Sequence, residues 1–390
     1  MRRQRRPIVR LPSGSRAGEE PRDSPSTSPS RARPAIDKLR QQTSNYSHSG
    51  MDLDSSVVHD ETYFFDDGDC LFQVENVLFN LHRVILGRDP ESMFRSMFAD
   101  AQGSSAEVIS LSGDTAAEFR VLCWAMYLLP GDAYALSMEQ IGDTEVKKYL
   151  DLLNMAHKYT LPHFEKWAWE MLSSVEDMLR PLQTYLNGCL EPGLEAAMAL
   201  AIRCNLSSLL DLVLAILIKS AKSGAISASR VLVLGEKYQQ RSLQTEIYII
   251  LWNRVQGRQD EGQAALIVSP LVGLGTQLGL TNAQMQRFFT GIVMLTSILA
   301  QIVSPGDPGT PCVYPSKECP CAGSTNEWRL MLAENRQHAS KSTRTEIRAI
   351  LQNAQSYGDK YRCIDEHLKS KNFCSDIDTY FLGPEPSTSS

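Results

Sequence analysis

The sequence lacks a continuous apolar segment long enough to cross a bilayer. Its most apolar run, Phe288–Val303, includes the polar residues Thr290, Ser297 and Gln301. The run is also shorter than the roughly 20 mainly apolar residues that a membrane span requires. We therefore expect a buried helix there and no membrane contact. The arginine-rich start likewise holds no apolar stretch of the kind found in secretory signals.

The sequence also lacks the short motifs that mark common enzyme classes. It contains no Gly-x-Ser-x-Gly, no His-Glu-x-x-His, no phosphate loop and no dinucleotide-binding glycine motif. His82 is a tempting catalytic residue, because it follows a predicted strand and begins a predicted helix. However, no nucleophile motif accompanies it, and Cys70 lies within an apolar strand. We predict a non-enzymatic protein without a cofactor, in which His82 makes a structural hydrogen bond.

The cysteines are few and scattered, and their odd number, nine, argues against a complete disulfide framework. We expect reduced thiols in an intracellular protein, cytoplasmic or nuclear. Cys312, Cys319, Cys321, Cys363 and Cys374 could supply four thiolates to a tetrahedral zinc ion. Their spacings do not include the familiar Cys-x-x-Cys, so we predict ordinary thiols and no metal site.

Residues 1–58 are dominated by Arg, Ser, Pro, Gly and Gln and show no apolar periodicity. Such a segment buries too little surface to offset the entropy lost on ordering, so we predict disorder. The basic cluster Arg2–Arg6 is most simply a solvated tail. The alternative is a nuclear-localisation or nucleic-acid-binding patch, and we expect no nucleic-acid contact elsewhere.

After Tyr63 the pattern predicts a small sheet. Asp69–Val74 and Val77–Leu81 are strand-like runs separated by Glu75-Asn76, and Asn76 tolerates the positive φ of a tight hairpin turn. A third short strand is predicted at residues 107–111.

Helices surround and follow these predicted strands. A helical pattern starts at His82 and is interrupted at Gly87–Pro90, and Asp114 is the expected N-cap of a further helix. Helix-turn-helix patterns then recur at 150–173, at 194–220 and more loosely at 231–252. The expected organisation is a disordered basic segment at 1–58, an α+β domain at 61–175, a helical region at 176–303, a Pro/Gly/Cys-rich loop at 304–326, a helical C-terminal segment at 327–382 and a disordered tail at 383–390.

Three stretches, Asp67–Val74, Leu78–Leu86 and Met93–Phe98, resemble the BTB (POZ) signature in order. That signature is a strand opening with Asp, a second strand ending in His-Arg or His-Lys, and helices carrying Leu, Phe and Met. Later segments also resemble the fold in order, so the resemblance covers about residues 61–175. It implies an α+β fold, a small β-sheet flanked by α-helices, and a role in protein–protein interaction. The stretch Tyr63–Asp69 and the helical region behind the domain further resemble a large group of BTB proteins from mushroom-forming fungi.

The resemblance also suggests a site. In BTB transcriptional repressors, the positions of Asp69 and Arg83 form a charged pocket that contributes to folding and to corepressor contact. Here the pair could instead be a buried ion pair or a set of local hydrogen bonds with a structural role. The remaining signature residues are expected to be mainly structural: Asp67, Gly68, Phe79, His82, Leu86, Phe94, Met97 and Phe98. The apolar set expected to close the sheet against helices is Leu71, Val74, Phe79, Leu81, Leu86, Phe94, Met97 and Phe98.

The resemblance leaves the partner open. BTB adaptors of cullin-type ubiquitin ligases carry an apolar-x-Glu signature, whereas Met97–Asp100 has Asp in place of Glu. A cullin adaptor and a nuclear transcription-associated regulator are the alternatives to a scaffold with unidentified protein partners. Dimeric BTB repressors carry an extra helix before the first strand, but residues 45–60 are polar without an apolar stripe. We therefore expect a weak homodimer or a monomer.

Overall fold

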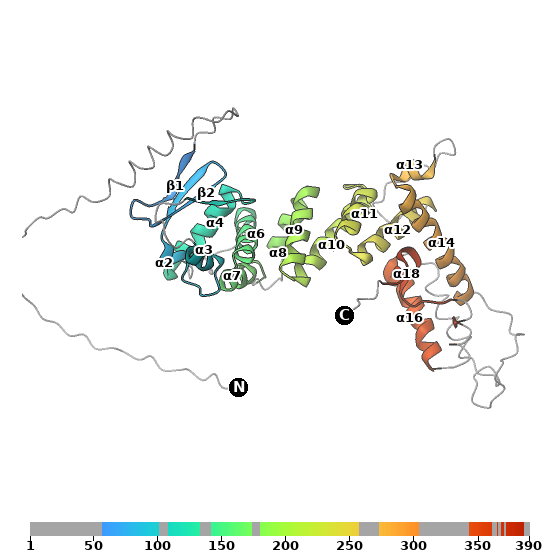
Figure 1. Cartoon of the computed structure of the whole chain (residues 1–390). Helices are drawn as coiled ribbons and strands as arrows, with labels where there is room; N and C mark the ends of the chain where they lie inside the picture. The colour runs from blue at the N-terminus through green and yellow to red at the C-terminus, as the bar shows by residue number, and fades with distance from the viewer. Residues whose placement is uncertain are drawn as a thin grey trace, which may run out of the picture. The chain divides into compact units, whose positions relative to one another are not determined.

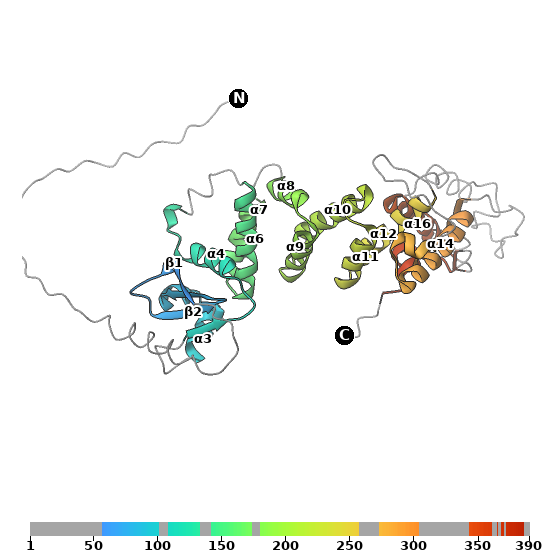
Figure 2. The ribbon, with the colours of Figure 1, turned by 90° about the horizontal axis from the view of Figure 1, so that it is seen from above.

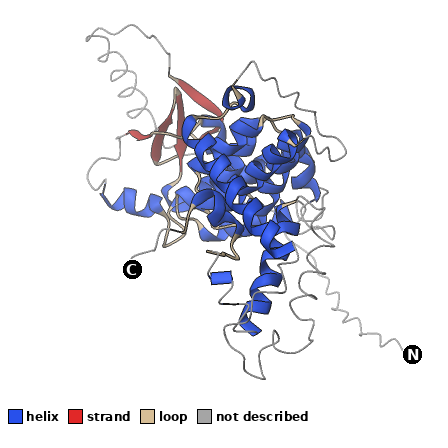
Figure 3. Ribbon diagram, turned by 90° about the vertical axis from the view of Figure 1, so that its right-hand side faces the viewer, coloured by secondary structure: helices blue, strands red, loops and turns tan. Residues whose placement is uncertain are grey.

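The computed structural model describes residues 57–100, 108–132, 142–173, 180–256, 273–303, 343–360, 365, 368–369 and 372–385. The described chain is a mixed α+β protein, mostly helical, whose strands gather in one small sheet (Figure 3). It divides into two compact units. The first holds the described residues of 57–87 and 97–116, and the second holds those of 88–96 and 117–385. This division differs from the expected organisation, which placed residues 61–175 in one domain.

The sheet has four strands in the order β1-β3-β2-β4. Figure 1 labels two of them, β1 and β2. The strands are β1 (Val58–Phe64), β2 (Cys70–Val74), β3 (Val77–Leu81) and β4 (Val108–Leu111). β2 and β3 form an antiparallel hairpin, while β1 pairs with β3 and β4 pairs with β2 in parallel. The predictions of β2, β3 and β4 are therefore confirmed, and β1 was not predicted. The sequence of β1 does not predict a strand, because it is polar and most of its side chains are exposed. Its partner strand is also distant in the chain.

The hairpin turn differs from the prediction in one detail. Glu75, and not Asn76, adopts the positive φ, at 54°. The Glu75 carboxylate also accepts a hydrogen bond of 2.9 Å from the Ala116 amide, at the start of α4 (Ala116–Tyr127). The expected N-cap, Asp114, lies two residues before that helix begins. The hairpin turn thus supplies an acceptor for the first turn of α4.

The predicted apolar core of the small sheet is only partly correct. Two short helices follow the hairpin: α2 (Arg83–Leu86) and α3 (Met93–Asp100). Of the expected set, the fully buried members are Val74, Phe79, Leu81, Leu86 and Phe94. Leu71, Met97 and Phe98 are half-exposed instead. For Leu71 the reason is strand alternation, because its neighbours Cys70 and Phe72 point to the other face and are buried.

The second unit begins with helices that pack through aromatic side chains. α6 (Asp143–Lys158) and α7 (Pro162–Ser173) lie where the sequence predicted them, with Pro162 at the first position of α7. Trp124 stacks on Trp167 with centroids 5.8 Å apart, and Tyr149 meets both rings edge-on. Such aromatic pairs add to the stability that burial alone provides.

A series of helical hairpins follows (Figure 2). Its helices are α8 (Arg180–Gly188), α9 (Glu191–Arg203), α10 (Ser207–Ser223), α11 (Ala228–Lys237) and α12 (Arg241–Val255). α9 packs against α10, and α11 packs against α12. These pairs confirm the predicted recurrence of helix-turn-helix units.

One type of turn joins the helices within each pair. The turns of α6–α7, α9–α10 and α11–α12 each contain one left-handed residue, namely Thr160 (φ 54°), Asn205 (φ 52°) and Gln239 (φ 54°). A hydrogen bond of 2.8 Å closes each turn, from the amides of Leu161, Leu206 and Gln240 to the carbonyls of Ala156, Ala201 and Gly235. These bonds have the spacing of a Schellman cap, which satisfies carbonyls at the end of the first helix. The repeat in the sequence therefore corresponds to a repeat in backbone geometry.

The next helices are α13 (Leu274–Leu278) and α14 (Asn282–Val303). We expected the apolar part of α14 to be buried, and this is wrong for one face. Phe288 and Leu295 are buried, whereas Phe289 and Val293 are exposed. Among the described helices, none combines the length and the apolarity needed to span a membrane.

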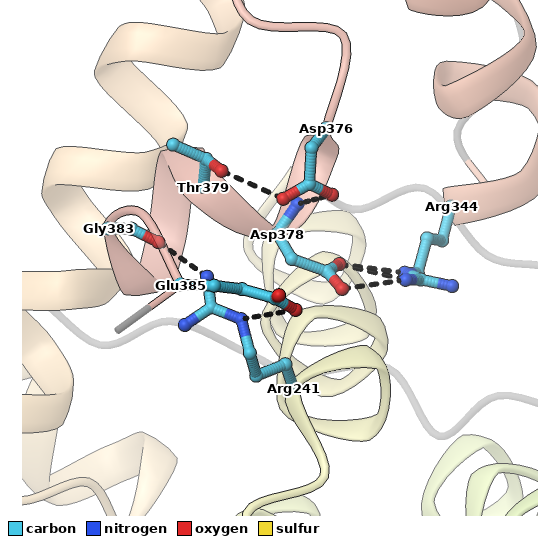
Figure 4. Close-up of polar contacts among 7 residues, drawn as sticks. All are labelled: Arg241, Arg344, Asp376, Asp378, Thr379, Gly383 and Glu385. Atoms are coloured by element: carbon cyan, nitrogen blue, oxygen red, sulfur yellow. Dashed lines mark hydrogen bonds and ion pairs between the residues drawn. The ribbon is translucent and has the colours of Figure 1, made fainter. Parts of the chain in front are cut away.

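The C-terminal helices fold back on earlier ones. α16 (Arg344–Lys360) and α18 (Ile377–Leu382) pack against α12, and α18 also packs against α14. Arg344 binds the Asp378 carboxylate through both oxygens, at 2.8 and 3.0 Å (Figure 4). Both side chains are nearly buried, with 13% and 12% exposed. Such a desolvated two-point pair fixes α18 against α16.

The residues after α18 also make defined contacts. Arg241, at the start of α12, donates to the Gly383 carbonyl and lies near the Glu385 carboxylate (Figure 4). Residues 383–385, which were expected to belong to a disordered tail, make these contacts with the start of α12. Phe381 stacks on Tyr248 with centroids 5.4 Å apart, which joins α18 to the middle of α12.

Several predictions fall outside the described residues. They concern the basic segment up to residue 56, the loop at 304–326, residues 327–342 and the tail from residue 386. Of the cysteines considered for zinc, Cys312, Cys319, Cys321 and Cys363 lie there too. Cys374 is described and is a free, half-exposed thiol.

Candidate functional site

The signature residues of the first unit meet where the β1–β2 loop passes the start of α2. A Cβ on Gly68 would lie 2.5 Å from the Asn80 side-chain oxygen, so a larger residue there would displace the Asn80 side chain. The Asn80 side-chain amide donates to the Phe65 carbonyl, and the Gly68 amide donates to the same carbonyl at 3.1 Å. The loop is therefore held by the one polar side chain in the otherwise apolar strand β3.

Asp69 and Arg83 form a reciprocal pair of hydrogen bonds. The Asp69 carboxylate accepts from the Arg83 backbone amide at 2.6 Å, and Arg83 Nε donates to the Asp69 carbonyl at 3.2 Å. Asp69 is exposed and Arg83 is half-buried. The geometry corresponds to the local hydrogen-bond alternative, and the pair is not a buried ion pair. Asp69 thus acts as an acceptor for the first turn of α2, in place of a side chain from the N-cap residue.

The Arg83 guanidinium has a second contact. Its central carbon lies 5.2 Å from the centre of the Phe98 ring, within the range of a cation–π interaction. Its Nη atoms make no hydrogen bond to any residue that the structure describes. The guanidinium is therefore held in place by Asp69 and Phe98 while its outer donors can bind a further acceptor.

His82 occupies the N-cap position of α2, and its side chain is directed to the β1–β2 loop. His82 Nε2 lies 3.3 Å from the Asp67 carboxylate, and the His82 ring lies against Phe65 with centroids 5.1 Å apart. The Asp67 side chain is 87% exposed, so the pair contributes little to stability. Its effect is to place an acidic and a basic group side by side on the surface.

Val84 lies next to these groups in the chain and leaves 75% of its surface exposed. We call Asp67, His82, Arg83 and Val84 the α2 surface. It combines a carboxylate, an imidazole, a guanidinium and an apolar side chain. This set is suited to binding, since hydrogen-bonding groups around an apolar contact occur in protein interfaces.

Cys70 is the thiol closest in sequence to this surface. It is buried at the start of β2, and its Sγ donates to the Leu81 carbonyl at 3.2 Å. Burial, reinforced by the nearby Asp69 carboxylate, raises the pKa of the Cys70 thiol to about 12. The reactive thiolate is therefore scarce at neutral pH.

The other signature residues are distributed between two places. Phe79 and Leu86 are buried in the first unit. Phe94 belongs to the second unit, where it stacks on Tyr159 with centroids 4.5 Å apart. Met97 is half-exposed. The structure therefore brings together Asp67, Gly68, Asp69, His82, Arg83 and Phe98, and leaves Phe94 outside the site.

Two residues that build the site, Phe65 and Asn80, were not predicted as site residues from the sequence. A signal for Asn80 was present, because it is the only polar residue in the predicted strand Val77–Leu81. No comparable signal marked Phe65, whose role depends on its backbone carbonyl and on the ring of His82.

No protein-family model, no curated protein and no solved structure matches this chain. The functional interpretation therefore rests on the residues and on their geometry.

Proposed function

We propose that this chain is an intracellular protein–protein interaction scaffold, cytoplasmic or nuclear, that acts through a BTB-type domain and catalyses no reaction. The proposal rests on one observation: residues of the BTB-like signature are joined by hydrogen bonds at one place in the fold. The signature Asp67-Gly68-Asp69 precedes one strand of a hairpin, His82-Arg83 follows the other, and reciprocal hydrogen bonds join Asp69 to Arg83. The order of sheet and helices along the chain agrees with the resemblance.

The α2 surface is the contact region in this proposal. Arginine is enriched among the residues that contribute most to binding in protein interfaces, and a pre-positioned side chain loses less entropy when it binds. Arg83 is held by Asp69 and Phe98, so its outer donors are already placed. Val84, the next residue along α2, adds an exposed apolar side chain. We expect a partner that offers a carboxylate beside an apolar side chain.

The helical hairpins of the second unit are a second scaffold surface in the same proposal. Stacked helix pairs commonly present extended surfaces to other proteins. Here the hairpins share one turn geometry, which gives successive pairs a similar local structure. Self-association is at most weak in this proposal, so the partner is a different protein.

The test is capture of partners by the full chain from the cells that produce it. Wild-type protein is compared with Val84→Asp, which places a charge on the exposed apolar residue of the α2 surface. The matched control is Val293→Asp, because Val293 lies on α14, outside both proposed surfaces, and is 65% exposed. The proposal predicts at least one protein that wild type and Val293→Asp retain and that Val84→Asp loses.

Two outcomes of that capture redirect or overturn the proposal. If the protein lost with Val84→Asp is a cullin, the scaffold is an adaptor of a ubiquitin ligase. If wild type and Val84→Asp retain the same set of proteins in the same amounts, the α2 surface is not a binding site and the proposal fails.

A further inference from the structure

Three potential metal ligands meet in the second unit, well away in sequence from the signature. His157 lies in the last turn of α6, Glu165 in the first turn of α7 and Cys204 at the C-cap of α9. His157 Nδ1 and the Glu165 carboxylate are 3.2 Å apart. The Cys204 Sγ completes the group, and the three donor atoms all lie within 4.8 Å of one another.

The repeated turn geometry places these residues. The α6–α7 turn brings the Glu165 carboxylate back beside His157, eight positions earlier in the chain. Cys204 occupies the equivalent turn after α9. A polar chain links that turn to α6, since Arg203 donates to the Asn154 side-chain oxygen at 2.8 Å. Cys204 is therefore held next to the helical turn of α6 that carries His157.

We propose that His157, Glu165 and Cys204 bind a divalent transition-metal ion of the zinc type. Zinc accepts imidazole nitrogen, thiolate sulfur and carboxylate oxygen, whereas magnesium and calcium require oxygen ligands. The 3.2 Å between the His157 and Glu165 donors suits two ligands of one tetrahedral ion. Three protein ligands leave the fourth position for water or for a group from a partner.

The surroundings of His157, Glu165 and Cys204 affect how a metal ion binds to them. Burial, with a smaller contribution from the Glu165 carboxylate, raises the pKa of the Cys204 thiol to about 11, and Arg203 opposes this change. A bound metal ion takes the Cys204 sulfur as the thiolate and releases its proton. Without metal, the His157–Glu165 pair is an ordinary surface contact of little energetic value.

The test is titration of the metal-free full chain with cobalt(II), a spectroscopic substitute for zinc. To remove background from other thiols, the starting protein carries serine at Cys312, Cys319 and Cys321. We expect a thiolate-to-cobalt absorption band that saturates at one equivalent and disappears when zinc is added. The variants are Cys204→Ser and His157→Gln, and the matched control is Cys189→Ser, because Cys189 is also a half-exposed thiol.

The proposal requires that the absorption band is lost in Cys204→Ser and kept in Cys189→Ser. In His157→Gln the absorbance of the band must be at least tenfold lower. If Cys204→Ser fails to fold, His157→Gln decides, because its half-exposed side chain tolerates replacement. A band of unchanged strength in His157→Gln, or no band in the starting protein, would overturn the proposal.

Discussion

Asp69 and Arg83 bind each other twice, and each bond joins the side chain of one residue to the main chain of the other. The pair therefore couples the start of β2 to the start of α2. The Asp69 carboxylate accepts from the Arg83 backbone amide and not from the guanidinium. One arrangement can therefore serve both local structure and surface recognition. The two roles that the sequence left open for this pair are compatible in the folded protein.

The structural role of Asp69 predicts a loss of stability on truncation. Asp69→Ala removes the acceptor from the first turn of α2, and we expect a loss of about 1 kcal/mol in the free energy of unfolding. Urea denaturation followed by circular dichroism measures this loss. The matched control is Asp67→Ala, which we expect to change stability by less than about 0.5 kcal/mol, because the side chain is exposed. Equal effects of the two variants would contradict the assigned role.

The repeated helix turns predict a gain of stability from glycine. Thr160 adopts a positive φ of 54°, which is unfavourable for a β-branched residue. We expect Thr160→Gly to raise the free energy of unfolding by a few tenths to about 1 kcal/mol. The control is His163→Gly, which places a glycine on the exposed face of α7. It should lower the free energy of unfolding by up to about 1 kcal/mol. The left-handed turn would be in doubt if both substitutions lowered stability.

The packing of α18 predicts that a methyl group at Gly291 is not tolerated. A Cβ at this position would lie 2.1 Å from the Phe381 ring, so α18 would have to shift. We expect Gly291→Ala to destabilise the protein by about 1–3 kcal/mol and to speed proteolysis after α16. Gly188→Ala is the control, because nothing lies within 4 Å of the added Cβ. Unchanged proteolysis in Gly291→Ala would show that α18 does not pack as described.

The buried Cys70 thiol predicts an alkaline loss of stability. Its pKa is raised in the folded protein from its ordinary value of 9.0 to about 12. Below pH 9 both states keep the proton, whereas between 9 and 12 only the unfolded chain releases it, so stability falls as the pH rises. We expect Cys70→Ala to show a shallower fall over that range in urea denaturation. An identical pH dependence in wild type and Cys70→Ala would refute the assigned burial of the thiol.

The sequence predicted the elements that depend on local patterns. The hairpin β2–β3 and the strand β4 are short apolar runs, and the helices α6 and α7 have apolar residues at helical spacing. Each was placed correctly. The repeat was visible because Ala156 and Ala201 each precede a leucine by five residues. These features follow from the side chains of neighbouring residues alone.

The features that were missed depend on contacts between distant residues. β1 is polar and becomes a strand by pairing with β3. The contact of Arg241 with Gly383 joins positions 142 residues apart and could not be inferred from periodicity. The exposure of one face of α14 was also missed, because an apolar residue in a helical pattern does not show whether another element covers it.

The central claim is that the α2 surface binds another protein, and a direct titration tests it. The purified full chain is titrated by calorimetry with the purified protein whose capture depends on Val84. We predict saturable binding that weakens at least tenfold, about 1.4 kcal/mol, in Val84→Asp and stays unchanged in Val293→Asp. Equal affinity of wild type and Val84→Asp for that protein would contradict the claim.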